Sequence, residues 1–290
     1  MKGHDTCLQY TRALLTGRGY HRRRIRPATL LLSLFLCLLI LAIFFPQWFT
    51  HFRADDADFD AILQPPTFHH WFGTDQLGRD VYARVIYGTS LSFTIGLAAT
   101  LLSVTGGLGL ALAATLSPGV IRRPLVRVLD ILQAFPELLL ALLTIAILGR
   151  GPANTFLAVG LAGIAGYARL ARSQILLVKQ SGYVQHAVTL GEHPAYIVLH
   201  HLIPNAIRPL TIMATIGVGQ AVLAASSLSF LGLGVAPPTA EWGALLADGR
   251  NFLDTAPWIS LLPATVIALS VIAITLTGRR LQRWFAKGIE

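Results

Sequence analysis

The chain has 290 residues, of which 54% are hydrophobic and only 13% are charged. Soluble domains usually carry about a quarter charged residues, so this composition predicts an integral membrane protein. The net charge of +9 is not accompanied by a basic patch interleaved with aromatic residues, so no nucleic-acid partner is expected. The two cysteines, Cys7 and Cys37, do not indicate a disulfide framework.

Six apolar stretches are long enough, or nearly so, to cross a bilayer as helices, which takes about 20 residues. They are residues 29–48, 89–117, 126–148, 153–173, 208–233 and 257–278. The first is too long for the core of a signal peptide and no cleavage site follows it, so we expect it to be retained. Small residues at four-residue spacing between 158 and 166 predict a seam of close helix packing. The sequence thus predicts an all-α polytopic membrane protein with six transmembrane helices.

Lysine and arginine are distributed unevenly over the connections between these stretches. The first 28 residues hold seven, the connections after the second and fourth stretches hold three and four, and the tail holds four, which makes 18 of the 23 in the chain. Because cytoplasmic loops carry the excess of positive charge, this distribution predicts that both termini lie in the cytoplasm. Topology accounts for most of the net charge.

The stretch 49–88 is therefore expected on the outer side, and it contains six aspartates against three arginines. Within it, Thr74 is suited to cap a helix that begins at Asp75, since a threonine hydroxyl accepts a hydrogen bond from a free amide of the first turn. The apolar residues that follow then share one face, which is typical of a helix lying in the membrane interface. A solvated loop helix with only a packing role fits the same pattern.

The third stretch is interrupted by polar residues. If its helix enters the membrane near Val126, Glu137 lies roughly 16 Å deep at a rise of about 1.5 Å per residue. A charge at that depth is costly, so Glu137 is a candidate gate or pathway residue, together with Asp130 and Pro136. Alternatively, residues 122–136 form an interfacial elbow and the span starts later. A structural bend between Asp130 and Pro136 is expected, because proline kinks a helix.

The polar stretch 180–206 predicts a short helix over 183–190, a turn at Gly191, and a second helix over 195–202, followed by Pro204. A helix pair of this kind is suited to docking on a soluble partner, although an ordinary interfacial loop fits as well. The four histidines between 186 and 201 are separated by the turn and a proline. Metal sites need three or four converging ligands, so no metal is expected there or at His69-His70.

This stretch resembles the EAA loop of binding-protein-dependent ABC permeases, the coupling element that inserts into a groove of the ATPase subunit. Ala187, Gly191, Pro204 and Asn205 match the family pattern, whereas Gln185 and His186 stand where the family usually has Glu and Ala. The resemblance implies that these positions contact the ATPase. The missing carboxylate removes one charge-based contact but leaves the shape of the loop intact.

Residues 73–88 resemble the GTDxxGRDxxSRxxxG signature of the dipeptide, oligopeptide and nickel permeases, in their C-type subunit. Eight positions match, and Ala83 replaces the usual Ser. The matching residues are Gly73, Thr74, Asp75, Gly78, Arg79, Asp80, Arg84 and Gly88. A third match covers residues 229–250, and the tail departs where Arg279 and Arg280 replace the usual Asp. The resemblance runs from about residue 29 and implies the type I fold of ABC importer permeases.

Within the third match, Glu241 and Trp242 follow Pro237-Pro238 on the expected outer side. They are candidates for lining the outer gate or for meeting a solute-binding protein. A plain structural turn fits the same residues.

The resemblance implies partners: a homologous permease, most simply as a heterodimer, two ATPase subunits, an extracytoplasmic solute-binding protein and membrane lipid. The chain has only three lysines, and none stands in a Gly-rich turn of the Walker A type, so ATP and Mg²⁺ are expected on the partner subunits and no cofactor in this chain. The expected role is a transport subunit, not an enzyme, in the bacterial cytoplasmic membrane.

The sequence divides into a basic arm (1–28), a first helix with an outer loop (29–88), a transmembrane core (89–278) containing the coupling loop, and a tail (279–290). Import of di- or oligopeptides is the leading interpretation, with nickel or a metal chelate as the alternative. A stand-alone secondary transporter would show paired ionisable residues near the middle of the membrane and inverted repeats, and apart from Glu137 neither is seen.

Overall fold

The computed structural model describes residues 27–287, with side chains from residue 31 to residue 283. The predicted N-terminal arm lies almost entirely outside the described residues, as does the end of the predicted tail. Within the described part, the chain is built from helices, and the one β-type contact is an isolated bridge between Thr74 and Asp80. The expected all-α fold is confirmed.

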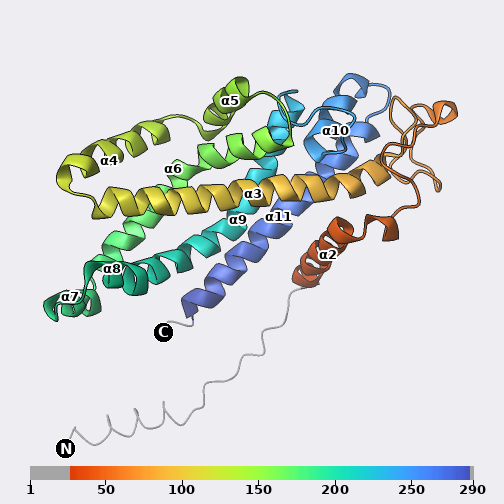
Figure 1. Ribbon diagram of the computed structural model, residues 1–290. Coiled ribbons are helices and arrows are strands. Elements are labelled where there is room, and N and C mark those ends of the chain that lie inside the picture. The colour runs from red at the N-terminus through yellow and green to blue at the C-terminus, as the bar shows by residue number, and fades with distance from the viewer. Residues whose placement is uncertain (1–26, 288–290) are drawn as a thin grey trace, which may run out of the picture.

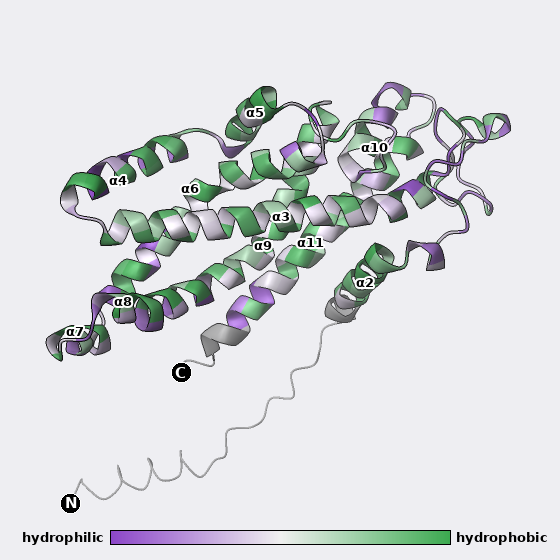
Figure 2. Cartoon of the chain, viewed as in Figure 1, coloured by the Kyte–Doolittle hydropathy of each residue, from purple (hydrophilic) through white to green (hydrophobic). Residues whose placement is uncertain are grey.

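Four long helices form the body of the molecule (Figure 1). These are α3 (Val81–Leu116), α6 (Pro152–Lys179), α9 (Ile203–Phe230) and α11 (Trp258–Lys287). Helix α3 packs most extensively on α6 and also contacts α9, while α11 lies along α9. The shorter α2 (Pro27–Phe44) contacts α3 and α11. Apolar residues run along the length of these helices, as Figure 2 shows.

Fewer spans stand out than the six expected from the sequence. By length and composition, three described helices are suited to crossing a membrane: Val81–Leu116, Pro194–Phe230 and Trp258–Arg283. A fourth is added if a bent pair, α4 (Gly119–Ala134) with α5 (Glu137–Leu148), counts as one span. Helix α6 is 28 residues long, but its second half carries several cations, which lowers its hydropathy.

The bent pair shows that the third apolar stretch is not one straight helix. Helices α4 and α5 meet at an angle of 97°. Phe135, which precedes Pro136, has an extended backbone with φ −87° and ψ 138°. A residue before proline is pushed out of the helical region by the proline ring, and Pro136 then begins α5 from its N-cap position. The bend predicted between Asp130 and Pro136 is confirmed, and a continuous helix over 126–148 is wrong.

The predicted seam of small residues lies between α3 and α6. A Cβ atom on Gly107 of α3 would lie 2.8 Å from the Ala168 amide nitrogen of α6, so the two backbones approach too closely for a larger residue. The Ser103 hydroxyl donates to the Gly160 carbonyl at 2.7 Å across this contact. Gly166, which the four-residue spacing places in the seam, faces open space instead. The seam therefore does not follow that spacing along its whole length.

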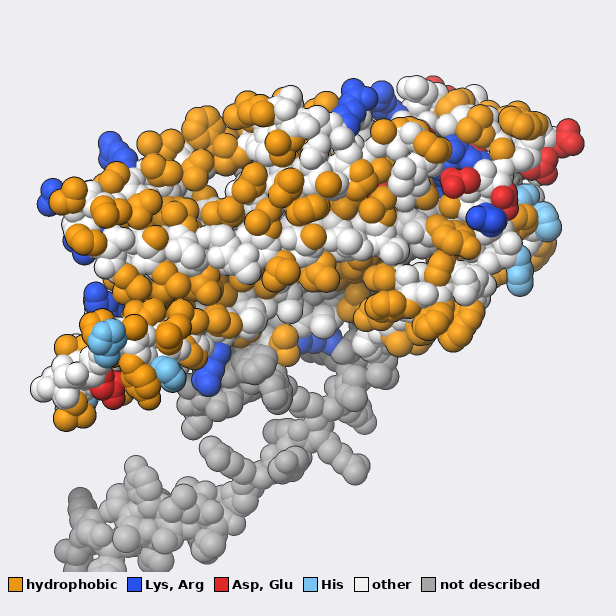
Figure 3. Space-filling model, in the orientation of Figure 1, with side chains coloured by type: hydrophobic (Ala, Val, Ile, Leu, Met, Phe, Trp, Pro, Cys, Tyr) orange, Lys and Arg blue, Asp and Glu red, His pale blue; other side chains and the backbone are white. Residues whose placement is uncertain are grey.

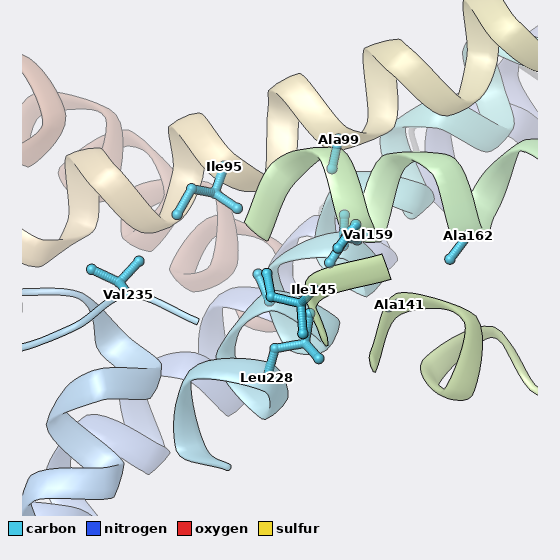
Figure 4. Close-up of a cluster of buried hydrophobic side chains, with 11 residues drawn as sticks. Ile95, Ala99, Ala141, Ile145, Val159, Ala162, Leu228 and Val235 are labelled. Carbon is cyan, nitrogen blue, oxygen red and sulfur yellow. The ribbon is translucent and has the colours of Figure 1, made fainter. Parts of the chain in front are cut away.

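One buried cluster joins α3, α5, α6 and α9 (Figure 4). Ile145 of α5 and Val159 of α6 meet Leu228 of α9, and Ile95 comes from α3. Burial of apolar area at about 25 cal/mol per Å² holds the short α5 onto the long helices. The cluster thereby fixes the position of the bend at Pro136.

The two ends of the bundle differ. One end, here called the cap, consists of residues 45–80 and 234–257 and includes η1 (Pro46–Trp48), η2 (Phe59–Ala61), α10 (Trp242–Gly249) and η4 (Arg250–Phe252). The other, called the elbow, is residues 180–206 with α7 (Gly182–Thr189), α8 (Pro194–Ile197) and η3 (Val198–Leu202). Figure 3 shows acidic side chains gathered at the cap end.

Candidate functional site

The predicted amphipathic helix beginning at Asp75 is not formed. Helix α3 begins at Val81, and its N-cap is Asp80, whose Oδ1 accepts from the Ala83 amide at 2.6 Å. The Thr74 hydroxyl instead accepts from the Gln64 amide at 2.8 Å and donates to the Ala61 carbonyl. Gly78 has φ +71°, which a right-handed helix excludes. The apolar residues from Val81 onward belong to the first turns of the long α3.

Three charged residues of the cap and Arg84 of α3 form a largely buried network. Asp75 accepts from the Arg79 side chain at 2.7 Å and lies 3.6 Å from a guanidinium nitrogen of Arg84. Arg84 also lies 3.6 Å from Asp248 of α10, and Arg79 lies 4.0 Å from the same carboxylate. The Arg84 side chain is 1% exposed. Burial raises the pKa of Asp248, and the charges of Arg84 and Arg79 partly offset this. The network ties the start of α3 to α10.

The remaining signature residues make close contacts around this network. Asp80 Oδ2 lies 2.8 Å from His70 Nδ1. A Cβ on Gly73 would lie 2.6 Å from the Gln64 carbonyl, and one on Gly88 would lie 3.3 Å from the Ala240 carbonyl. The glycines of the signature thus lie where two backbone segments approach each other closely. Its charged residues form the ion pairs that join those segments.

Glu241 and Trp242 are buried in the cap. Glu241 caps α10 by accepting from the Gly243 and Ala244 amides at 3.0 and 2.9 Å. The indole of Trp242 donates to the Val85 carbonyl of α3 at 3.0 Å. Burial raises the pKa of Glu241, and hydrogen bonds from these amides act in the opposite direction. Both side chains hold α10 against α3, and neither lines an open passage in this structure.

Glu137 lies elsewhere, at the bend. It is the first residue of α5, and its side chain has no hydrogen bond or ion pair within the described residues. It lines a hollow of about 300 Å³ with Gln220 and Ser227 of α9. A neighbouring hollow continues along α9 past Ser227 to Phe230. The hollow thus places polar side chains midway along an apolar bundle, and Gln220 is exposed there within the described residues.

Asp130 is separate from Glu137. It lies near the middle of α4, exposed, in a hollow that is otherwise lined mainly by arginines. The three residues singled out around the bend therefore have different surroundings: Asp130 near cations, Pro136 at the break, and Glu137 beside α9.

The elbow has a packed base. Ala187 and Val184 of α7 are buried against Ile175 of α6 and Leu210 of α9. Gly191 turns the chain between α7 and α8 with φ +79°, a conformation that favours glycine. Asn205 donates to the His201 carbonyl at 2.7 Å, and α9 begins at Ile203, so Pro204 lies in its first turn.

The tip of the elbow is exposed and apolar. Leu190 is 81% exposed and Val188 is 60% exposed, and Tyr183, Tyr196 and Leu199 also present much of their surface. Gln185 is exposed, with its amide donating to the Gln180 carbonyl at 3.2 Å, and His186 is exposed beside it. Exposed apolar side chains on a packed base are typical of a surface that a partner protein covers.

Comparison with known proteins now decides the family. Residues 81–290 match the family model described as binding-protein-dependent transport system inner membrane component. The chain belongs to this family. It is a permease subunit of an ABC importer, and its role is transport, not catalysis.

The permease is similar to two relatives over most of its length. It is 37% identical over 264 residues to the glutathione transport system permease protein GsiD of Shigella flexneri serotype 5b, covering 91% of this chain and 87% of that protein. It is 36% identical to GsiD of Escherichia coli O6:K15:H31 over the same length. These relatives support the dipeptide, oligopeptide and nickel branch of permeases, whose signature residues 73–88 resemble.

Solved structures support the fold. The inward-facing MetNI methionine ABC transporter matches with a TM-score of 0.57 and 18% identity, covering 69% of the permease and 95% of that chain. An amino acid ABC transporter with histidines matches with a TM-score of 0.55 and 20% identity, covering 71% and 94%. The family implies ATPase subunits and a solute-binding protein as partners, and a multi-pass location in the inner membrane. It excludes the alternative of a stand-alone secondary transporter.

Several residues important to this geometry were missed by sequence reasoning. Asp248 completes the cap network, and Gln220 faces the same hollow as Glu137. Both are far from their partners in sequence, so no local pattern marks them. Leu190 and Val188 were missed as tip residues because a leucine next to a glycine turn predicts neither burial nor exposure.

Proposed function

We propose that this permease forms half of the translocation path of an importer for glutathione-like and other short peptides. The substrate class is supported by the name of the GsiD relatives and by the signature at residues 73–88. The GsiD proteins of two organisms are similar to the chain over 91% of its length. The likeness therefore includes both the cap and the transmembrane helices.

The exposed apolar tip of the elbow is the observation that carries the proposed mechanism. Helix α7 is anchored by buried Val184 and Ala187, while Leu190 at its end projects into solvent. A partner that moves this tip moves α6 and α9 with it, because the base packs on both helices. Closure of an ATPase pair thereby changes the opening between the permease halves. Gln185 and His186 sit on the exposed face of α7 and meet the same partner.

We further propose how the chain is oriented in the membrane and which partners it contacts. Both termini lie in the cytoplasm, the elbow faces an ATPase subunit, and the cap meets an extracytoplasmic solute-binding protein. The second half of the path is a homologous permease that packs on the open side of α9. ATP and Mg²⁺ are held by the two ATPase subunits, and this chain holds no cofactor.

Glu137 and Gln220 are proposed to line the path. Short peptides carry an α-ammonium group and several amide groups, which a carboxylate and a carboxamide recognise by hydrogen bonds. The carboxylate of Glu137, at the first turn of α5, makes no hydrogen bond or ion pair with the described residues and is available for this contact. Glu137→Gln is expected to lower peptide uptake severalfold while leaving assembly of the importer unchanged.

The test is uptake in a strain lacking this gene. Labelled glutathione, labelled dipeptides and labelled nickel are supplied separately, and uptake is compared with a strain carrying the gene again. Loss of glutathione or dipeptide uptake supports the proposal. Loss of nickel uptake alone overturns the peptide assignment and favours the metal alternative, which the same signature also allows.

Copurification tests the coupling role. The tagged chain is extracted in mild detergent, and the ATPase subunit is expected to come with it. Leu190→Asp is expected to remove the ATPase without removing the partner permease. Full ATPase recovery with that variant contradicts the proposed role of the elbow tip.

A further inference from the structure

A basic hollow lies where α4 crosses α6, away from the cap, the bend and the elbow tip. Its volume is about 320 Å³. Helix α4 contributes five residues to its lining and α6 contributes one. In the orientation proposed above, the α6 residue belongs to the cytoplasmic half of that helix. The lining residues are Arg122, Arg123, Val126, Arg127, Asp130 and Arg172.

The arginines of this hollow are not neutralised by the part of the chain that the structure describes. Within the described residues, none of the four makes a side-chain hydrogen bond or an ion pair, and Asp130 makes none either. The Nε atom of Arg172 is buried and has no hydrogen-bond partner. Leaving a buried donor of a charged group unsatisfied is unfavourable, so the hollow fits an acceptor that the described residues do not supply.

Helix α4 also carries an apolar face beside the arginines. Leu129 is buried against Ala168 of α6, which seats the helix on the bundle. Val120 is 86% exposed, and Ile121, Val128 and Ile131 also present about half or more of their surface. A helix with this division lies in a membrane interface, with cations at headgroup depth and apolar side chains against acyl chains. Figure 3 shows Lys and Arg side chains at the end of the molecule where α4 lies.

We propose that the α4–α6 hollow binds the phosphate of an anionic phospholipid headgroup. Guanidinium groups bind phosphate oxygens in paired hydrogen bonds, and four of them converge here with one carboxylate among them. The exposed apolar residues of α4 contact the acyl chains, which a soluble phosphate lacks. The site lies in the inner leaflet and rests on the orientation proposed above, but not on the proposed substrate.

The experiment measures lipid bound to the complete importer. The complex is purified in mild detergent, phosphatidylglycerol is titrated, and bound lipid is counted by native mass spectrometry. Phosphatidylethanolamine and inorganic phosphate are titrated in parallel. The test variant is Arg127→Gln with Arg172→Gln. The matched control is Arg169→Gln, which removes an exposed arginine one turn away on α6 that does not line the hollow.

We expect phosphatidylglycerol to bind more tightly than phosphatidylethanolamine, and the double variant to weaken it by about tenfold or more, since each arginine near an anionic headgroup contributes to binding. The control is expected to bind as the native chain does. Arg123→Gln with Arg127→Gln, which changes only exposed α4 side chains, gives the same readout if the first variant is unstable.

Three results overturn the assignment. Equal loss in Arg169→Gln means that general surface charge attracts the lipid. Displacement of the lipid by millimolar inorganic phosphate means that the site takes a soluble anion. Unchanged lipid binding with loss of the ATPase subunit in the double variant means that a protein covers the hollow. None of these measurements depends on peptide uptake. The lipid-binding result therefore stays valid even if the proposed substrate is wrong.

Discussion

The cap and the elbow differ in what their side chains contact within the chain. Where the cap meets α3, Arg84 is buried between Asp75 and Asp248, and Glu241 and Trp242 are buried with their hydrogen bonds made. In the elbow, the buried residues form only a base, and the tip exposes Leu190. The charge pairs of the cap are made within one chain, whereas the tip of the elbow presents apolar surface that the described residues leave uncovered. Substitutions in the cap should therefore affect stability, and those in the elbow should affect partner binding.

The largest effect is expected for Arg84→Ala. Removing this guanidinium leaves Asp75 and Asp248 buried with less compensation, and breaking a buried ion pair costs about 3–5 kcal/mol. The measurement is thermal unfolding of the purified chain in detergent. Arg150→Ala, at an exposed position, is the control and should unfold near the native temperature. Similar unfolding of both variants means that the cap network does not stabilise the fold.

A smaller loss is expected for Ser92→Ala. The Ser92 hydroxyl accepts from the Trp242 amide at 3.0 Å and donates to Glu241 at 3.1 Å. Its removal leaves a buried amide without a partner, at a cost of about 1–3 kcal/mol. The same unfolding assay applies, with Ser173→Ala at an exposed position of α6 as the control. An unchanged unfolding temperature contradicts the role of Ser92 in joining α3 to the cap.

Gly191→Ala tests the turn of the elbow. The left-handed backbone at φ +79° costs an alanine about 1 kcal/mol, although a Cβ there meets no other atom. We expect a slight fall in unfolding temperature and a clear loss of copurifying ATPase, because the turn sets the angle of the tip. Gly182→Ala, which has open space and an ordinary helical backbone, should retain the ATPase. Equal ATPase recovery from the two variants refutes the role of the turn.

The smallest change in stability is expected for Leu190→Asp. An exposed side chain contributes within about 0.5 kcal/mol, so unfolding should be unchanged. ATPase association is expected to be lost, since a carboxylate would be buried in the partner's groove. Phe68→Asp, which changes a fully exposed apolar residue in the cap, should leave ATPase binding intact. Loss of the ATPase from both variants would show that the effect is not specific to the elbow.

Sequence reasoning reached much of this arrangement for identifiable reasons. The bend at Pro136 was predictable because proline constrains the residue before it. The turn at Gly191 was predictable because glycine accepts a positive φ. The helix at Asp75 was predicted wrongly: Thr74 has the character of a helix cap, but its hydroxyl is used by Ala61 and Gln64, and Asp80 takes the role six residues later.

The sequence by itself determined the membrane class, the order of the apolar helices, and the positions of the bend and the elbow turn, because hydropathy and the backbone limits of proline and glycine act locally. Only the tertiary structure decided which charges are paired. Asp248 pairs with Arg84 across 164 positions of chain, while the arginines of α4 line one hollow with Arg172 and Asp130 and form no ion pair there within the described residues. Such pairings depend on how helices pack, and packing is a property of the whole fold.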